Sequence, residues 1–197
     1  MLSREEIDNL MKIEGDVRGT VLLTDARYIR NKEGEEALGI IMDRVRELGC
    51  PIEYNGIKAM EWLPLRLRAI SLPVIRDVFG WSDDDIKAMG IAAPKHSFIV
   101  KLLVKFFISF PTAIGNAPEY WLKHYSVGRL EIAEINEVEK NIIIRLHGFK
   151  VHRTYCRYLE GYFQSFLQLI LPHDTAKTEE LKCVFDGHPY HEYKSSW

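Results

Sequence analysis

Apolar and polar positions alternate in two short runs of the last third of the chain, and this pattern predicts a pair of β-strands. Leu130 and Ile132 alternate with charged residues in the first run, and Ile142 and Ile144 share a face in the second. A period of two residues places such side chains on one side of a sheet. The link 136–140 is polar and has the length of a hairpin loop, so we expect two antiparallel strands.

A long amphipathic helix is predicted over residues 152–171. Its apolar positions recur at helical spacing, and they are Tyr155, Tyr158, Leu159, Tyr162, Phe163, Phe166, Leu167 and Ile170. Gly161 lies in the middle, where glycine costs about 1 kcal/mol relative to alanine. We therefore expect a close helix–sheet or helix–helix crossing at this glycine, and Pro172 to end the helix.

A closing hairpin follows this helix. Its first strand has three side chains on one face, Leu181, Cys183 and Phe185. The pair 186–187 is Asp-Gly and turns the chain, and residues 189–195 return. An odd-length turn would place Cys183 and His191 on the same face as close cross-strand partners.

The first 125 residues read as mostly helical. Ser3 and Glu6 form a capping box, which predicts a short helix to about Ile13. Residues 17–23 are rich in β-formers and predict a short strand. A helix follows over 33–49, ended by its terminal glycine.

Prolines and acidic residues mark the remaining helices. Pro64 opens a largely apolar helix that Pro73 should kink or divide. Ser82 caps a short helix with an acidic first turn, ending at Gly90. Two further helices are expected, at 94–110 and, with a break near Pro118, at about 113–125.

These elements predict an α+β fold, in which an antiparallel sheet of about four to five strands carries a helical layer packed on one side. No linker or repeat divides the chain, so we expect a single domain over residues 1–197. It would have a helix-rich part, 1–125, and a mixed part, 126–197.

Composition narrows the class of protein. With 47% hydrophobic residues the chain can bury a sizeable core, and its net charge of −2 without a basic stripe argues against a nucleic-acid partner. Three cysteines and a charged start without an apolar signal core favour a cytoplasmic location. The most apolar stretch, 98–110, is too short to span a membrane and contains Lys101 and Lys105.

Part 126–197 resembles the 4-vinyl reductase-type small-molecule-binding domain, also described as a hydrocarbon-binding module. That family belongs to a superfamily of ligand-binding domains shared between nitric-oxide signalling and Golgi transport, which includes the TRAPP subunits. The resemblance is carried by three motifs, Gly128-Arg129-Leu130, Cys156-Arg-Tyr-Leu-Glu-Gly161-Tyr-Phe, and Glu180-Leu-Lys-Cys183-Val-Phe-Asp-Gly187-His-Pro-Tyr-His191-Glu-Tyr193. The family's last motif ends in Cys-x-Phe, whereas this chain has His191 and Tyr193 there.

The resemblance implies a sheet with helices on one side, often as a homodimer, and a pocket between them for a small apolar molecule or an acyl chain. Aromatic residues would line this pocket, namely Phe106, Phe107, Phe110, Tyr155, Tyr158, Tyr162, Phe163 and Phe166. An aromatic stripe at helical spacing is also typical of a plain hydrophobic core, so both interpretations stay open.

A metal site is a second candidate. The family motif implies that Cys156 lies near the hairpin that carries Cys183 and His191. Thiolate and imidazole ligands suit zinc, and His188 or His152 would supply a fourth ligand. The alternative is two buried cysteines and an exposed histidine without a metal.

Haem and catalysis are not favoured by the sequence. Haem-binding relatives in the superfamily hold the propionates with a Tyr-x-Ser-x-Arg clamp, whereas in Tyr125-Ser126-Val127-Gly128-Arg129 the serine comes one place early. No histidine is placed as an evident proximal ligand. Nucleophilic triads, phosphate loops and dinucleotide motifs are absent, so we do not expect an enzyme.

The first hypothesis for function is therefore a sensory or carrier module that binds a small hydrophobic molecule and acts on a protein partner in trans. A second is a scaffold or assembly subunit of the TRAPP type. A third is a reductase-associated enzyme of pigment metabolism, against which the missing redox-cofactor motif argues.

Overall fold

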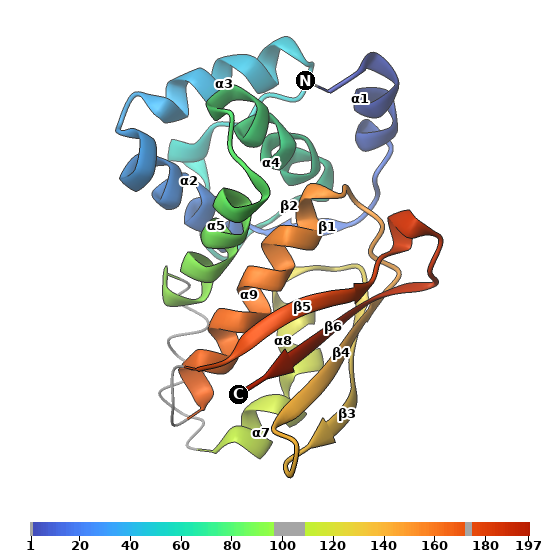
Figure 1. Cartoon of the computed structure of the whole chain (residues 1–197). Helices are drawn as coiled ribbons and strands as arrows, with labels where there is room; N and C mark the ends of the chain where they lie inside the picture. Colours follow the sequence, from blue (N-terminus) through green and yellow to red (C-terminus); the bar gives the residue numbers. More distant parts are fainter. Residues whose placement is uncertain (1, 97–108, 172–174) are drawn as a thin grey trace.

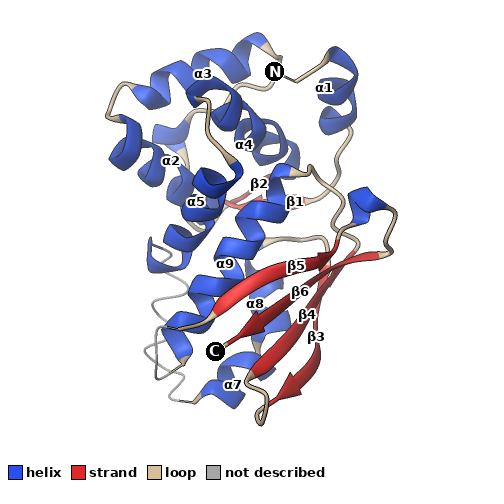
Figure 2. Cartoon of the chain, in the orientation of Figure 1, coloured by secondary structure: helices blue, strands red, loops and turns tan. Residues whose placement is uncertain are grey.

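The computed structural model describes residues 2–96, 109–171 and 175–197 (Figure 1). The helices are α1 (Arg4–Met11), α2 (Gly19–Glu33), α3 (Ala37–Glu47), α4 (Leu65–Phe79), α5 (Asp83–His96), α7 (Phe110–Gly115), α8 (Ala117–His124) and α9 (Thr154–Ile170). The strands are β1 (Asp16–Arg18), β2 (Trp62–Pro64), β3 (Arg129–Asn136), β4 (Asn141–His147), β5 (Lys177–Lys182) and β6 (Tyr190–Ser196). Helices α1 to α5 gather at one end of the molecule, the sheet of four strands lies at the other end with α7 and α8, and α9 runs between the two (Figure 2). Among the described residues, no helix combines the length and apolar character needed to cross a bilayer.

The main sheet has the strand order β3-β4-β6-β5, and each neighbouring pair is antiparallel. Leu130 pairs with Leu146 and Ile132 with Ile144, so the apolar positions of β3 and β4 share one face. Helices α8 and α9 pack against this sheet, α8 on β3 and α9 on β5 and β6. A separate two-stranded sheet joins β1 and β2. The predicted α+β fold, with a helical layer on an antiparallel sheet, is confirmed.

Helices α5 and α9 cross where two glycines face the opposite backbone. A Cβ atom on Gly161 would lie 2.1 Å from the carbonyl oxygen of Lys87, and one on Gly90 would lie 2.0 Å from that of Tyr158. Backbone oxygens cannot rotate away as the ends of side chains do, so only glycine permits this approach. The expected close crossing at Gly161 is confirmed as a helix–helix contact.

The strand predicted over residues 17–23 is wrong beyond its first two residues. Strand β1 ends at Arg18, and α2 begins at Gly19, which packs against the carbonyl oxygen of Lys58. Leu22, Ala26 and Ile29 are almost fully buried at helical spacing. Burial of this helical face therefore overrides the local β-propensity of the segment.

Three helix boundaries also differ from the expectations. Residues 62–64 form β2 rather than a helix start, and α4 continues through Pro73 without dividing. The residues around Pro73 are buried, and their packing offsets the cost of about 3 kcal/mol for proline in a helix. Helix α5 runs past Gly90 to His96, because the glycine belongs to the crossing with α9. Most of the helix predicted over 94–110, with Lys101 and Lys105, lies outside the described residues, as does Pro172.

Other boundaries agree or differ in detail. The capping box at Ser3 is present, and the helix expected at 113–125 is divided at Asn116 into α7 and α8. In the closing hairpin, Cys183 is buried but Leu181 is 47% exposed, so they do not share a face. A register shift at the end of β5 and a short 3₁₀ turn at Val184–Asp186 break the alternation that was predicted there.

A fully buried ion pair joins the N-terminal helices to the rest of the molecule. The guanidinium of Arg68 in α4 donates to both carboxylate oxygens of Asp25 in α2, at 2.7 and 3.1 Å. It also donates to the hydroxyl of Tyr125 at 2.5 Å, and its charge lies 4.2 Å from the ring centroid of Tyr158. Arg68 and Asp25 are 0% and 1% exposed, so each depends on the other for compensation of its charge.

We expect Arg68→Met to lower the free energy of unfolding by about 3–5 kcal/mol, because it leaves the Asp25 carboxylate buried without its partner. Arg66→Met, on the exposed side of the same helix, should change it by less than about 0.5 kcal/mol. Adding Asp25→Leu to Arg68→Met should recover part of the loss. Urea denaturation of the variants measures these values, and equal losses for Arg66→Met and Arg68→Met would contradict the assignment.

Candidate functional site

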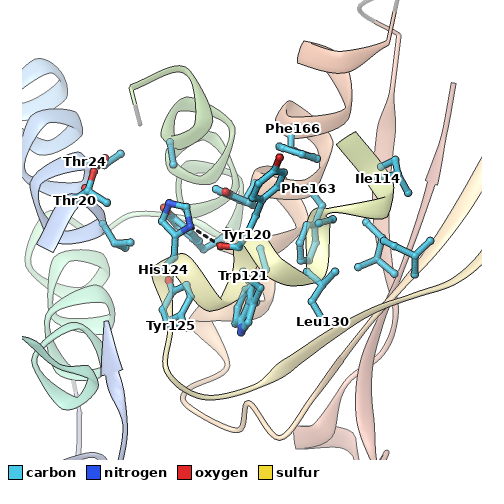
Figure 3. Close-up of a pocket in the computed structure, with 18 residues that line it drawn as sticks. Thr20, Thr24, Ile114, Tyr120, Trp121, His124, Tyr125, Leu130, Phe163 and Phe166 are labelled. Carbon is cyan, nitrogen blue, oxygen red and sulfur yellow. Dashed lines mark hydrogen bonds between the residues drawn. The ribbon is translucent and has the colours of Figure 1, made fainter. Parts of the chain in front are cut away.

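An apolar cavity of about 60 Å³ lies between the helices and the inner face of the main sheet. Figure 3 shows its walls, which come from α2, α5, α7, α8, α9, β3 and β4. No acidic residue, lysine or arginine is among the described residues that line it. The space is therefore suited to an uncharged and largely apolar occupant.

His124 is the one histidine among the described residues of the cavity wall, and Figure 3 shows it between α2 and the aromatic rings. Its Nδ1 lies 3.0 Å from the carbonyl oxygen of Tyr120, one helical turn earlier. Because a carbonyl only accepts, Nδ1 carries the proton and Nε2 keeps its lone pair. Burial, with smaller effects of nearby cations, lowers the pKa of His124, so the ring is neutral at neutral pH.

The C-terminal end of α8 is held by three aromatic contacts. Trp121 donates from Nε1 to the carbonyl oxygen of Val127 at 2.8 Å and stacks on Tyr125, with ring centroids 4.5 Å apart. Phe149 packs edge-on against both rings. Together with the hydrogen bond from Arg68 to Tyr125, these contacts place His124 at a defined point of the wall.

The eight aromatic residues predicted to line a pocket do not all border this cavity. Four of them border this cavity, Tyr158, Tyr162, Phe163 and Phe166. Tyr155 is buried outside it against Phe149, and Phe110 packs on the ring of Trp197 at 5.2 Å. Phe106 and Phe107 lie outside the described residues.

The walls that α2 and α8 contribute were not expected from the sequence. Residues 19–33 were not recognised as a helix, so Val21 and Thr24 were not considered. The spacing of Tyr120, Trp121 and His124 would have placed all three on one helical face. That pattern was the available signal for His124.

A second cluster joins the start of α9 to the closing hairpin. The sulfur atoms of Cys156 and Cys183 are 3.3 Å apart, and Cys156 Sγ lies 3.8 Å from His191 Nδ1. The same Nδ1 is 3.1 Å from Oε1 of Glu180. One ligand atom from each of these four residues lies within 4.8 Å of the others, which is a spacing that suits a shared metal ion.

The orientation of His191 favours a ligand role for Nδ1. Its Nε2 lies 3.1 Å from the carbonyl oxygen of Phe149, so Nε2 carries the proton. Nδ1 then turns its lone pair toward Cys156 and Glu180. Metal-bound histidines are commonly held in this way, with the second ring nitrogen donating to a backbone carbonyl.

The fourth member of the cluster is Glu180, which belongs to the third sequence motif but was not expected as a ligand. His188 is exposed, and His152 accepts from the backbone N–H of Thr154, so neither joins the group. Burial, with Glu180 nearby, raises the pKa of the Cys156 thiol. Without a cation this thiol is therefore protonated, whereas a bound metal would favour the thiolate.

Comparisons with known proteins identify the fold. No family model and no curated protein matches the sequence. An H-NOX protein from S. oneidensis in the Fe(II) ligation state matches with a TM-score of 0.71 and 11% identity, over 91% of this chain and 95% of that chain. An oxygen-binding H-NOX domain related to soluble guanylate cyclases, in its oxygen complex, matches with a TM-score of 0.65 and 13% identity, over 91% and 94%. An Fe(II) unliganded H-NOX protein from K. algicida gives 0.61 and 10%, over 91% and 95%.

These structures overturn the expectation that haem is disfavoured. The matches include H-NOX proteins in Fe(II) and Fe(II)NO ligation states and one that probes heme distortion. The departure from the clamp motif therefore does not separate this fold from that of haem proteins. In this chain, Tyr125 accepts from Arg68, and the Ser126 hydroxyl accepts from the backbone N–H of Asp16 at 2.7 Å.

The residues present fit a haem in one respect. His124 presents a neutral imidazole nitrogen to the cavity, which is the form that ligates iron. The described lining residues offer no lysine or arginine for the propionates, and Arg129 is 68% exposed beside Glu131. His124 would thus be the residue that binds the iron, and side chains of the present wall would have to move to admit a porphyrin.

The resemblance to the 4-vinyl reductase-type and TRAPP-type domains stays a prediction, since the structures named above do not bear on it. At identities of 10–13% the matched structures establish the fold alone. The chain therefore has an α+β fold like that of the solved H-NOX domains.

Proposed function

We propose that this chain is a sensory or carrier module without catalytic activity, and that it binds a small molecule in the cavity between α8 and α9. The observation that carries the proposal is an apolar cavity with one neutral imidazole, His124, on its wall. Binding sites of this kind gain affinity from apolar burial and specificity from a few placed polar groups.

The chemistry of the wall supports binding rather than catalysis. Its described residues include no serine, cysteine, carboxylate or lysine, and His124 is the one side chain among them that could act as a base near neutral pH. Burial raises the pKa of Tyr125 to about 12 and raises that of Tyr162 further, so neither phenol is a base near neutral pH. The reductase alternative therefore has less support than the binding module.

Transmission of ligand binding would start at Tyr125. This residue borders the cavity and also accepts from Arg68, whose partner Asp25 lies in α2. A ligand that favours one position of Tyr125 would thus bias the N-terminal helices as well. The protein partner in trans, the homodimer, the acyl chain and the TRAPP-like scaffold role stay predictions.

A ligand panel tests this proposal. We expect small apolar molecules to raise the melting temperature of the wild type, and Val21→Phe, which fills the cavity from α2, to abolish the shift. Leu23→Phe is the matched control, because its side chain does not line the cavity. Thermal shift and native mass spectrometry measure binding, and an unresponsive wild type or an unchanged response in Val21→Phe would refute the cavity as the site.

Haem is a second candidate ligand, favoured by the neutral His124 on a fold shared with haem proteins. We expect haemin to bind with a histidine-ligated absorption spectrum that His124→Ala loses and added imidazole restores. His152→Ala is the control, since His152 does not border the cavity. Identical spectra for wild type and His124→Ala would exclude ligation by this residue.

We also propose that the cluster of Cys156, Glu180, Cys183 and His191 holds a zinc-type cation. Two thiolates, an imidazole and a carboxylate form a ligand set that zinc accepts in tetrahedral geometry. The cation would remove the conflict between the carboxylate of Glu180 and the lone pair of His191 Nδ1, which are 3.1 Å apart. It would pin the first turn of α9 to the hairpin, which is a structural role.

Metal analysis tests this site. We expect about one zinc per chain in wild type and in Cys50→Ser, and loss of the metal with a lower melting temperature in Cys183→Ser. Cys50 is the matched control because it is buried but lies outside the cluster. Equal metal content in the wild type and Cys183→Ser, measured by mass spectrometry, would contradict the proposal.

A further inference from the structure

We infer that the ligand of the cavity is a small neutral molecule that donates an O–H or N–H hydrogen bond to Nε2 of His124. The inference rests on the proposed binding function and names the chemistry of the ligand. It follows from the hydrogen bonds, the charges and the volume of the cavity.

Several polar groups of the wall already have partners inside the protein. The hydroxyl of Thr24 donates to the carbonyl oxygen of Thr20 at 2.8 Å, and Trp121 donates to Val127. Tyr125 accepts from Arg68. His124 uses Nδ1 as its donor to Tyr120, and no described residue hydrogen-bonds its Nε2. An acceptor on the wall of a cavity is matched by a ligand that brings a donor.

The charges around the cavity favour an uncharged ligand. None of the described lining residues carries a formal charge at neutral pH. The nearest buried cation, Arg68, is neutralised by Asp25. A carboxylate or ammonium ion would lose its hydration here without gaining a partner, so a neutral molecule is favoured.

The volume limits the size of the ligand. At about 60 Å³ the cavity is less than half of the roughly 150 Å³ that holds benzene in an engineered apolar cavity. A short-chain alcohol or amide fits this space with its apolar end toward Phe163 and Leu130 and its donor toward His124. Figure 3 shows His124 and the pair Phe163 and Leu130 on separate parts of the wall.

Three fluorinated probes of similar size test the inference by ¹⁹F NMR on the full chain. They are 2,2,2-trifluoroethanol, which donates, 2,2,2-trifluoroethyl methyl ether, which only accepts, and trifluoroacetate, which is charged. We expect the alcohol to bind about tenfold more tightly than the ether, the value of one well-placed hydrogen bond. Trifluoroacetate should not bind.

Two variants test whether His124 causes the preference for the alcohol over the ether. His124→Phe keeps an apolar ring but removes the acceptor, so it should bind alcohol and ether equally, whereas Val21→Phe should bind neither. Circular dichroism confirms that each variant is folded. Equal binding of alcohol and ether by the wild type, or an unchanged preference in His124→Phe, would overturn the inference, as would the absence of binding by any probe.

Acid provides an independent readout. The cations that face His124 are Arg18 of β1, Arg68 of α4 and Lys123 of α8, and all of them favour the neutral ring. Alcohol binding should therefore persist below pH 6.5 and fall only once the ring is protonated, while ether binding should not follow this titration. If the wider ligand panel or haemin binds but the alcohol is not preferred, the donor inference fails while the binding function stands.

Discussion

The buried pair of Arg68 and Asp25 is the interaction on which the rest of the structure depends. It joins α4 to α2, and through the hydroxyl of Tyr125 it reaches the end of α8. The ring of Tyr158 in α9 lies over the same guanidinium. Three walls of the cavity, α2, α8 and α9, are therefore positioned by contacts with the one buried charge of Arg68. A charge that is buried away from water tolerates little displacement from its partners.

This arrangement explains how an apolar cavity can coexist with a defined geometry. Apolar contacts alone specify shape loosely, since they have no preferred direction. The polar contacts of Arg68, Trp121 and His124 supply direction, and each has its partner within the protein. Near the same end of α9, the cluster around Cys156 joins the start of the helix to the hairpin.

Local sequence patterns correctly predicted those elements in which tertiary packing favours the same secondary structure as the sequence itself. The capping box at Ser3, the alternation in β3 and β4 and the amphipathic α9 are of this kind. The helix α2 was missed because burial of its apolar face outweighs the β-propensity of Val17–Leu23, and α5 because Gly90 serves a contact with a distant helix.

The same contrast holds for the candidate sites. Residue type indicated Cys183 and His191, but only the folded chain brings Glu180 beside them. The position of His124 depends on where α8 ends and on the hydrogen bond from Arg68 to Tyr125. A local sequence pattern contains neither. The expectation against haem failed because it relied on a short motif, whereas a fold is retained at an identity of 11%.

The glycine crossing has a consequence for how the cavity can adapt. Because Gly90 and Gly161 bring the backbones of α5 and α9 into contact, the two helices have no room to slide and form one stiff side. A helix movement that enlarges the space would then come from the opposite side, where α8 is a short helix of 8 residues. Diversification of the binding preference by such a movement, in evolution or in the laboratory, would accordingly proceed through substitutions in α8 while the crossing of α5 and α9 is kept.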